Sequence, residues 1–207
     1  MNEKNAPFKI IDVEQRSEKW FSYRIGKITG SNFSKILTPT LKPSAQQKDV
    51  IYQAVGELLT GEVEPTFQSY AMERGALLED EALDFINFTT EYNFKKVGML
   101  DSGLGFSVSP DGFDLENKIG LEIKSPLSKS HVKYLVDGVL PKEYLLQVHG
   151  SMLVSGFDKW MFVSYYPGLK ALILEVKRDE KIIKPLFENL IECSKEIDKR
   201  YKQLKEE

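Results

Sequence analysis

The segment Phe106–Pro126 reads F-S-V-S-P-D-G-F-D-L-E-N-K-I-G-L-E-I-K-S-P, and it decides the fold that we predict. In its second half, apolar residues alternate with Gly120, Glu122 and Lys124. Successive side chains of a β-strand point to opposite faces, so this alternation predicts a strand that turns its apolar residues toward the core. Glu122 and Lys124 are then expected together on the other face.

The first half of the segment predicts a second strand. Residues 106–109 alternate in the same way, and the Pro-Asp-Gly sequence at 110–112 ends the strand in a turn. If the two strands are antiparallel neighbours, Asp111 converges with Glu122 and Lys124. Two carboxylates and an amine indicate a site for a hard divalent cation beside a group that positions water. Taken alone, the pattern is also typical of the wet face of an amphipathic sheet.

A third carboxylate lies in a predicted helix from about Ser69 to Phe88. Stepping by three and four residues from Met72 gives an apolar stripe that only Glu79 interrupts. A carboxylate on a core-facing stripe is costly unless it is paired with a cation or bound to a metal. Glu79 is therefore a candidate third ligand.

The N-terminal region suggests a phosphate site. Residues 10–37 predict a short strand, a helix opened by Ser17, and a second helix capped by Thr29 or Ser31. A helix N-terminus presents free N–H groups, and Arg24 a few residues earlier would add a charged donor. The alternative is a plain helix cap beside a surface arginine.

The remaining elements follow from periodicity and turn residues. In a helix predicted at 142–155, Tyr144 and Gln147 share one face because they are three residues apart. The other predictions are a helix at 45–60, a strand at 92–101, a short helix or loop at 128–136, strands at 158–166 and 171–177, and a helix from about 180 to the end.

Composition narrows the class of protein. The 207 residues are 42% hydrophobic and 29% charged, which predicts one globular domain over residues 1–207. The N-terminus lacks a signal-peptide pattern and no apolar run reaches membrane-helix length, so we expect a cytoplasmic protein without a membrane contact. The single Cys193 excludes a disulfide framework, and His131 and His149 have no hydrolase triad signature around them. A net charge of −3 disfavours non-specific coating of DNA but allows a basic channel.

These residues match a known family: the chain resembles bacteriophage lambda exonuclease and the YqaJ-type viral recombinases, within the PD-(D/E)xK nuclease superfamily. The resemblance covers most of the chain. It rests on five ordered blocks: Trp20 to Ser31, Gly75 to Glu79, Ser109 to Gly112, Gly120 to Pro126, and Tyr144 to Met152.

The resemblance implies an α/β fold with a restriction-endonuclease-like core, in which helices flank a central mixed β-sheet. It implies a Mg²⁺-dependent 5′→3′ exonuclease that digests one strand of linear double-stranded DNA to mononucleotides and leaves a 3′ overhang. The overhang would serve phage-type recombination with a single-strand annealing protein. The family also implies two Mg²⁺ ions, replaceable by Mn²⁺, a homotrimeric ring, and a phage or prophage origin in a bacterial host.

The roles implied for the central residues are as follows. Asp111, Glu122 and the backbone carbonyl of Ile123 resemble the Mg²⁺ ligands, and Glu79 resembles the helix carboxylate that completes the metal site. Lys124 resembles the residue that positions or activates the attacking water.

The resemblance implies supporting roles for residues around this centre. Gln147 resembles the residue that orients the lysine or the scissile phosphate, Tyr144 resembles an active-site neighbour, and Asp101 matches a nearby acid with a structural alternative. The pocket for the 5′-terminal phosphate is implied to comprise Arg24, Ser31 and Ser109.

Two other readings remain open. The chain could be a different DNA nuclease of the same superfamily, such as an endonuclease or a junction resolvase, or an inert module that binds DNA ends. An inert module would be expected to lack an acid or the lysine, whereas Asp111, Glu122, Lys124 and Glu79 are all present. Arg24 favours recognition of a DNA end.

Overall fold

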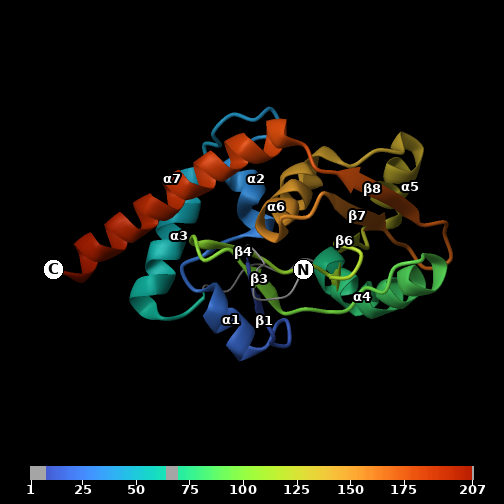
Figure 1. Ribbon diagram of the computed structural model, residues 1–207, viewed down its shortest axis with the longest axis horizontal. Helices are drawn as coiled ribbons and strands as arrows, with labels where there is room; N and C mark the ends of the chain where they lie inside the picture. The colour runs from blue at the N-terminus through green and yellow to red at the C-terminus, as the bar shows by residue number, and fades with distance from the viewer. Residues whose placement is uncertain (1–7, 64–69, 207) are drawn as a thin grey trace.

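The computed structural model describes residues 8–63 and 70–206, and these form a mixed α/β fold (Figure 1). The first sheet has the strand order β1-β3-β4-β2, in which only the β2–β4 pair is parallel. Its strands are β1 (Lys9–Ile11), β2 (Ile28–Thr29), β3 (Met99–Asp101) and β4 (Phe106–Val108).

The second sheet has the order β5-β6-β7-β8, in which β6 and β7 are parallel and the other pairs are antiparallel. The expected mixed α/β architecture is confirmed, and the strands are divided between two sheets. The strands of the second sheet are β5 (Gly112–Asp114), β6 (Ile119–Lys124), β7 (Lys159–Ser164) and β8 (Leu172–Lys177).

The predicted pairing of the two strands in the Phe106–Pro126 segment is wrong. β4 pairs with β3 in the first sheet, and β6 pairs with β5 and β7 in the second. The physical reason is that residues 109–111, which include the strand-breaking Pro110, carry the chain from one sheet to the other. The strand predicted at 92–101 is likewise limited to β3, with one isolated bridge between Lys95 and Phe113.

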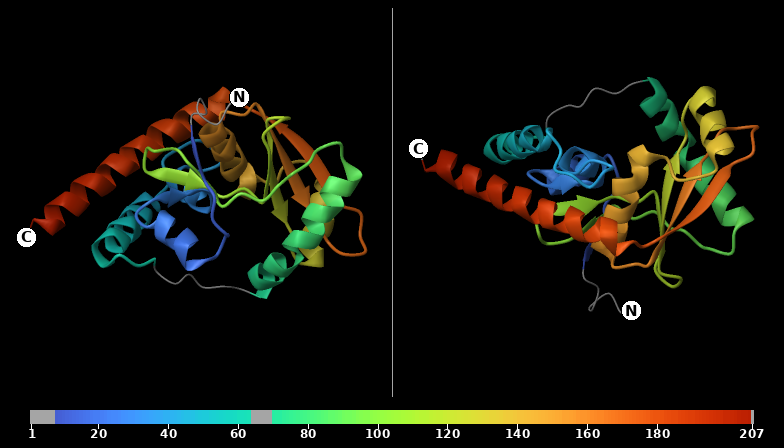
Figure 2. Two further views of the ribbon diagram at one scale, coloured as in Figure 1. Left: turned by 60° about the horizontal axis from the view of Figure 1, so that its bottom comes forward. Right: turned by 90° about the horizontal axis from the view of Figure 1, so that it is seen from above.

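Strand β6 is covered on both faces. Ile119, Leu121 and Ile123 pack in one cluster with Ala82 and Ile86 of helix α4 (Tyr70–Thr89). The opposite face meets helix α6 (Leu145–Ser155), and Figure 2 shows the sheet between these two helices. The second face is therefore not a wet face, and the charged residues on it need specific partners.

The helices follow the predicted positions with one exception. Ser17 caps α1 (Glu18–Arg24) by accepting a hydrogen bond from the Trp20 N–H, as expected. Thr29 precedes only a 3₁₀ turn, η2 (Gly30–Asn32), and a four-residue helix, α2 (Phe33–Ile36), and its side chain makes no cap bond. The expected helix cap by Thr29 or Ser31 is therefore wrong, and the phosphate site expected at Arg24 and Ser31 stays a prediction.

The other helices are confirmed in type. The start predicted for α4 at Ser69 and the side chain of Met72 lie outside the described parts of the chain. Among the described residues, no helix is both long and apolar enough to span a membrane. The remaining helices are α3 (Gln47–Thr60), α5 (Ser128–Asp137), the 3₁₀ turn η3 (Lys142–Tyr144) and α7 (Glu180–Lys205).

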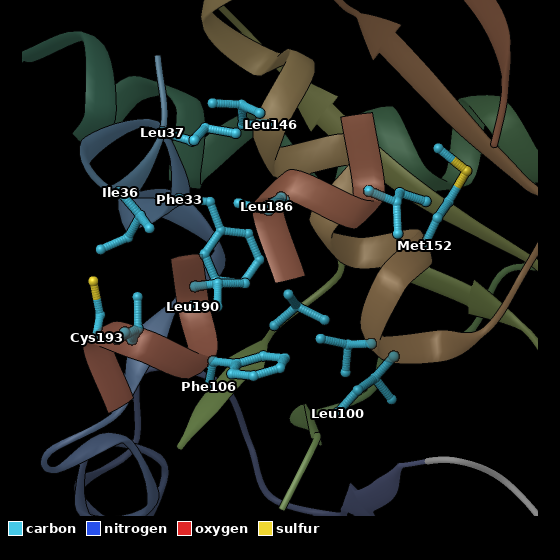
Figure 3. Packing of buried hydrophobic residues seen from close by; sticks show 14 of the residues in the cluster. Phe33, Ile36, Leu37, Leu100, Phe106, Leu146, Met152, Leu186, Leu190 and Cys193 are labelled. Atoms are coloured by element: carbon cyan, nitrogen blue, oxygen red, sulfur yellow. The ribbon is translucent and has the colours of Figure 1, made fainter. Parts of the chain in front are cut away.

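The main core joins the two sheets through α6. Figure 3 shows Phe33, Phe106, Met152 and Leu186 packed together, and the same cluster includes Trp160 of β7. α6 and α7 come from distant parts of the sequence but pack side by side against α2. This core fixes the position of α6 over the face of β6 that carries Glu122.

Candidate active site

Asp111 lies in the crossing between the two sheets and is held against β6. Its backbone N–H donates to the Leu121 carbonyl at 3.1 Å, and its Oδ2 accepts from the Ile123 N–H at 2.7 Å. Asp111 thus reaches β6 although β4 does not pair with that strand. The convergence predicted for Asp111, Glu122 and Lys124 is therefore present, but it arises from a different strand arrangement.

Glu122 is the buried centre of the site, with 2% of its surface exposed. Its Oε1 lies 2.5 Å from Lys124 Nζ and accepts a hydrogen bond from Gln147 Nε2 at 2.6 Å. Gln147 is on α6, one turn after Tyr144, whose ring lies 5.2 Å from Lys124 Nζ. The helix face predicted from the spacing of Tyr144 and Gln147 is the one that covers the β6 charges.

The electrostatics of this centre are unbalanced toward negative charge. Burial raises the pKa of Asp111 well above the ordinary aspartate value, and the carboxylates of Glu122 and Glu79 add to that rise. Burial alone would lower the pKa of Lys124, but Glu122 and Asp111 together raise it above its usual value. Lys124 is therefore a stable cation between carboxylates rather than a neutral base.

Glu79 approaches the same centre from α4, with 13% of its side chain exposed. Its Oε2 lies 2.6 Å from Arg16 Nη2 and its Oε1 lies 3.4 Å from Lys96 Nζ. Arg16 has a left-handed backbone with φ of 68°, which a non-glycine residue rarely adopts. The partly buried Glu79 is thus compensated by two cations that the sequence pattern did not indicate.

The donor set suits a hard divalent cation. Among the residues that the structure describes, no three Asp, Glu, His or Cys side chains form a metal-binding group by themselves. The carboxylates of Asp111 and Glu122 nevertheless outnumber Lys124, and Glu79 acts on Asp111 electrostatically although Arg16 and Lys96 pair with it. Carboxylate and carbonyl oxygens are the ligands that Mg²⁺ prefers, so the residues present fit this ion.

Arg24 lines a cavity that is separate from the carboxylate centre. Its guanidinium stacks on the Trp20 ring at 4.0 Å, and its Nη2 donates a long hydrogen bond of 3.3 Å to Thr29 Oγ1. Thr29 Oγ1 lies 3.4 Å from Ser31 Oγ. Burial lowers the pKa of Arg24 to about 10. A partly buried guanidinium with few donors engaged is suited to bind an anion.

Trp20 connects Arg24 with the chain segment that leads to Asp111. Its indole Nε1 donates to Ser109 Oγ at 3.1 Å and to the Gly98 carbonyl at 2.9 Å, while its ring carries Arg24. Ser109 is two residues before Asp111 on the same crossing segment. Three residues were expected to bind a terminal phosphate. Arg24 and Ser31 line one cavity, whereas Ser109 contacts the indole of Trp20, on which Arg24 stacks.

Asp101 is not placed at the carboxylate centre. It forms an ion pair with Lys27 and accepts a hydrogen bond from the Gly103 N–H. Lys27 lines the Arg24 cavity, so Asp101 acts on that cavity through the lysine. The structural alternative given above for Asp101 agrees with this position.

Several residues of the site gave little signal in the sequence. Gln15 donates to the carbonyls of Val97 and Pro110 at 2.8 and 3.0 Å, which ties down the segment before Asp111. Arg16 and Lys96 are polar residues in turns, where charge is common. The one sequence signal for Gln15 and Arg16 is that they directly precede Ser17, which caps α1.

Comparisons with known proteins agree with this arrangement. A family model described as YqaJ-like viral recombinase domain matches residues 19–158. An alkaline exonuclease (LHK-Exo) from Laribacter hongkongensis is similar with a TM-score of 0.82 and 27% identity, over 92% of this chain and 97% of that one. The same values hold for its complex with dAMP.

A more distant likeness concerns the fold alone. A phage related exonuclease from Haemophilus somnus 129PT has a TM-score of 0.67 at 16% identity, over 86% of this chain and 96% of that one. No match is found among curated protein sequences.

Proposed function

The chain belongs to the family of YqaJ-like viral recombinase domains and is a nuclease of the exonuclease type, and from this premise we propose its specific activity. It is a Mg²⁺-dependent 5′→3′ exonuclease that degrades one strand of linear double-stranded DNA to mononucleotides. The single observation that supports this most directly is the link through Trp20 between the partly buried Arg24 and Ser109, two residues before Asp111.

This link favours an exonuclease over an endonuclease. An endonuclease acts within a continuous strand and has no use for a terminal-phosphate site beside the cleavage centre. A 5′ exonuclease removes the terminal nucleotide, so it needs a site for the terminal phosphate next to the site that cleaves. Arg24 and Ser31 supply donors for that phosphate, and Ser109 stands between them and Asp111.

The residues of the centre take distinct roles in this proposal. Asp111, Glu122, Glu79 and the Ile123 carbonyl would hold Mg²⁺, which stabilises negative charge on the attacking and leaving oxygens. Lys124, 2.5 Å from Glu122 Oε1, would orient the attacking water molecule beside the phosphate. Gln147 holds Glu122 Oε1 in place through its amide.

The proposal extends to the role of the product. Digestion from 5′ ends leaves a 3′ single strand, which a single-strand annealing protein would use in recombination. The membership in a viral recombinase family supports this role and a phage or prophage origin. Mixing the nuclease with an annealing protein and measuring joined products from overlapping linear duplexes tests it, and a nuclease that leaves blunt ends would exclude it.

One experiment separates the readings of the site. Linear and covalently closed circular duplexes are incubated with the protein in Mg²⁺ or EDTA, and the released nucleotides are measured. We expect mononucleotides from linear DNA in Mg²⁺ only. Cleavage of the circular duplex would identify an endonuclease, and retention of both duplexes with binding to ends would identify an inert end-binding module.

A further inference from the structure

The cavity that contains Arg24 also contains a buried carboxylate that has no role in the proposal so far. The cavity has a volume of about 660 Å³ and lies between α1 and α3. Cationic and hydroxyl groups form one part of its wall, which suits a phosphate. Glu57 of α3 also lines it and is only 5% exposed. A negative charge is unexpected in a site for an anion, because it opposes binding.

Glu57 is fixed in place by its hydrogen bonds. Its Oε2 accepts from the Gly26 N–H at 3.2 Å and its Oε1 accepts from Gln53 Nε2 at 2.9 Å. Gly26 has φ of 70°, and a Cβ there would lie 2.4 Å from the Leu58 side chain, so this turn fits closely against α3. The contact therefore holds the turn that follows Arg24 at the end of α1.

Glu57 also acts on Arg24 by its charge. Its carboxylate opposes the loss of charge that burial imposes on the guanidinium. The other two cations of the cavity are less suited to bind a phosphate. Lys27 is paired with Asp101, and Lys35 is exposed to solvent. Arg24 is thus the main phosphate donor of the cavity, and Glu57 is the buried charge that offsets it.

We propose that Glu57 is a positioning residue that sets the strength and turnover of 5′-phosphate binding, an inference that rests on the proposed exonuclease function. Through Gly26 it holds the Arg24 turn, and through its charge it weakens the cavity's attraction for a phosphate. An exonuclease must release and rebind a terminal phosphate after every nucleotide. A cavity without Glu57 would hold each new end too firmly for rapid advance.

The test uses Glu57→Gln, which removes the charge and keeps an oxygen that accepts from the Gly26 N–H. Its amide nitrogen can donate to Gln53 once the Gln53 amide turns its oxygen toward it. The matched control is Glu62→Gln, which makes the same charge change at an exposed residue on the rim of the same cavity, where solvent screens its charge. Binding of 5′-phosphoryl and 5′-hydroxyl duplexes is measured by fluorescence polarisation in EDTA, where cleavage is prevented. Thermal melting of each variant checks the fold.

We expect Glu57→Gln to bind the 5′-phosphoryl duplex on the order of fivefold more tightly, as for one unit charge removed near a partly hydrated site. Binding of the 5′-hydroxyl duplex and the Glu62→Gln protein should change less than about twofold. On long duplexes with Mg²⁺, Glu57→Gln should make the first cleavage normally but advance more slowly. A merely structural role would weaken binding instead.

Other results have definite meanings. Unchanged or weaker binding of the 5′-phosphoryl duplex by a folded Glu57→Gln protein overturns the inference. If that protein melts early, Asn32→Asp adds a charge to the wall of the same cavity and leaves the hydrogen bonds of Glu57 in place, and failure of this variant to weaken 5′-phosphate binding overturns it too. A wild-type protein that binds both ends equally overturns the phosphate pocket itself, and that outcome is visible before any variant is tested.

Discussion

Lys124 and its neighbours form a unit in which each charge depends on the others. Removing one member leaves the remaining buried charges uncompensated and displaces the ligands, so effects on rate should be large and non-additive. We predict that Asp111→Ala, Glu122→Ala and Lys124→Ala each lower the single-turnover cleavage rate by on the order of a hundredfold or more. Lys177→Ala on the exposed edge of β8 is the control. A Lys124→Ala protein with more than about a tenth of the wild-type rate would disprove the role of the lysine.

Asp111 also gives a prediction about pH. Because the folded-state pKa is raised, the folded protein binds more protons than the unfolded chain between the ordinary aspartate pKa and the raised value. Its contribution to stability is therefore full below the ordinary pKa and is lost as pH rises through the raised one. Asp111→Asn removes the buried charge, so it should raise the melting temperature of the metal-free protein at alkaline pH. The rise should be about 2–4 °C for each kcal/mol gained in the free energy of unfolding.

The same variant tests the metal site. Asparagine keeps the acceptor for the Ile123 N–H but removes the charge that a cation would bind. Added Mg²⁺ should stabilise the wild-type protein against thermal unfolding and should have little effect on Asp111→Asn. An equal rise in melting temperature for both proteins would mean that Mg²⁺ binds elsewhere.

Arg24 gives a prediction about substrate ends. Its partly buried guanidinium supplies charge-assisted donors, so Arg24→Ala should abolish the preference for a 5′-phosphoryl over a 5′-hydroxyl end. Cleavage at the carboxylate centre should persist at saturating DNA, because Arg24 does not contact that centre. Initial rates on both ends are compared in both proteins. Equal wild-type rates on the two ends would argue against the pocket.

Helix α6 shows how an element positions the site. It places Gln147 on Glu122, and it approaches α2 so closely that a Cβ on Gly150 would lie 2.1 Å from the Phe33 ring. We predict that Gly150→Ala lowers the free energy of unfolding by about 1–3 kcal/mol through overpacking. Gly56→Ala in α3, where the Cβ meets open space, should instead stabilise by about 0.5–1 kcal/mol. Urea unfolding measures both.

A Gly150→Ala protein that is as stable as the wild type, or more stable, would mean that α6 can move away from Phe33. Activity measured alongside is informative, because a displaced α6 would carry Gln147 away from Glu122 and slow cleavage as well.

The elements also show what sequence could and could not predict. Periodicity gave β6, α3 and α7 correctly, because each has a long run with one clear repeat. Periodicity also indicated β4 as a strand but not its pairing partner, since three residues between two turns carry no information about which strand they pair with. It could not distinguish a wet strand face from one covered by α6, because that contact depends on packing between distant segments.

Site residues, too, were predictable where the signal is local and not where it depends on contacts between distant segments. Asp111, Glu122 and Lys124 were predictable because chemistry and strand spacing coincide in one segment. Arg16, Lys96 and Glu57 were not, because each acts on a partner more than a few residues away through a fold that the local pattern does not specify.

At the scale of the whole molecule we predict a homotrimeric ring around DNA, an expectation from the family resemblance. A chain with net charge −3 retains a polyanion most easily by enclosing it and concentrating its cations inside. Light scattering should give about three times 23.7 kDa. Excess unlabelled DNA added after loading should leave digestion of the bound duplex running. A monomeric mass would remove the ring and leave the active-site argument intact.

The crossing of the chain between its two sheets has a consequence for biosynthesis. All the acidic groups and the lysine of the centre lie before residue 125, yet β6 gains its parallel partner β7 and its covering helix α6 only from residues 145–164. A nascent chain on the ribosome therefore carries every charged group of the cleavage centre before it can arrange them. We therefore expect the nascent chain to be inactive until residues 145–164 have left the ribosome and can pack against β6.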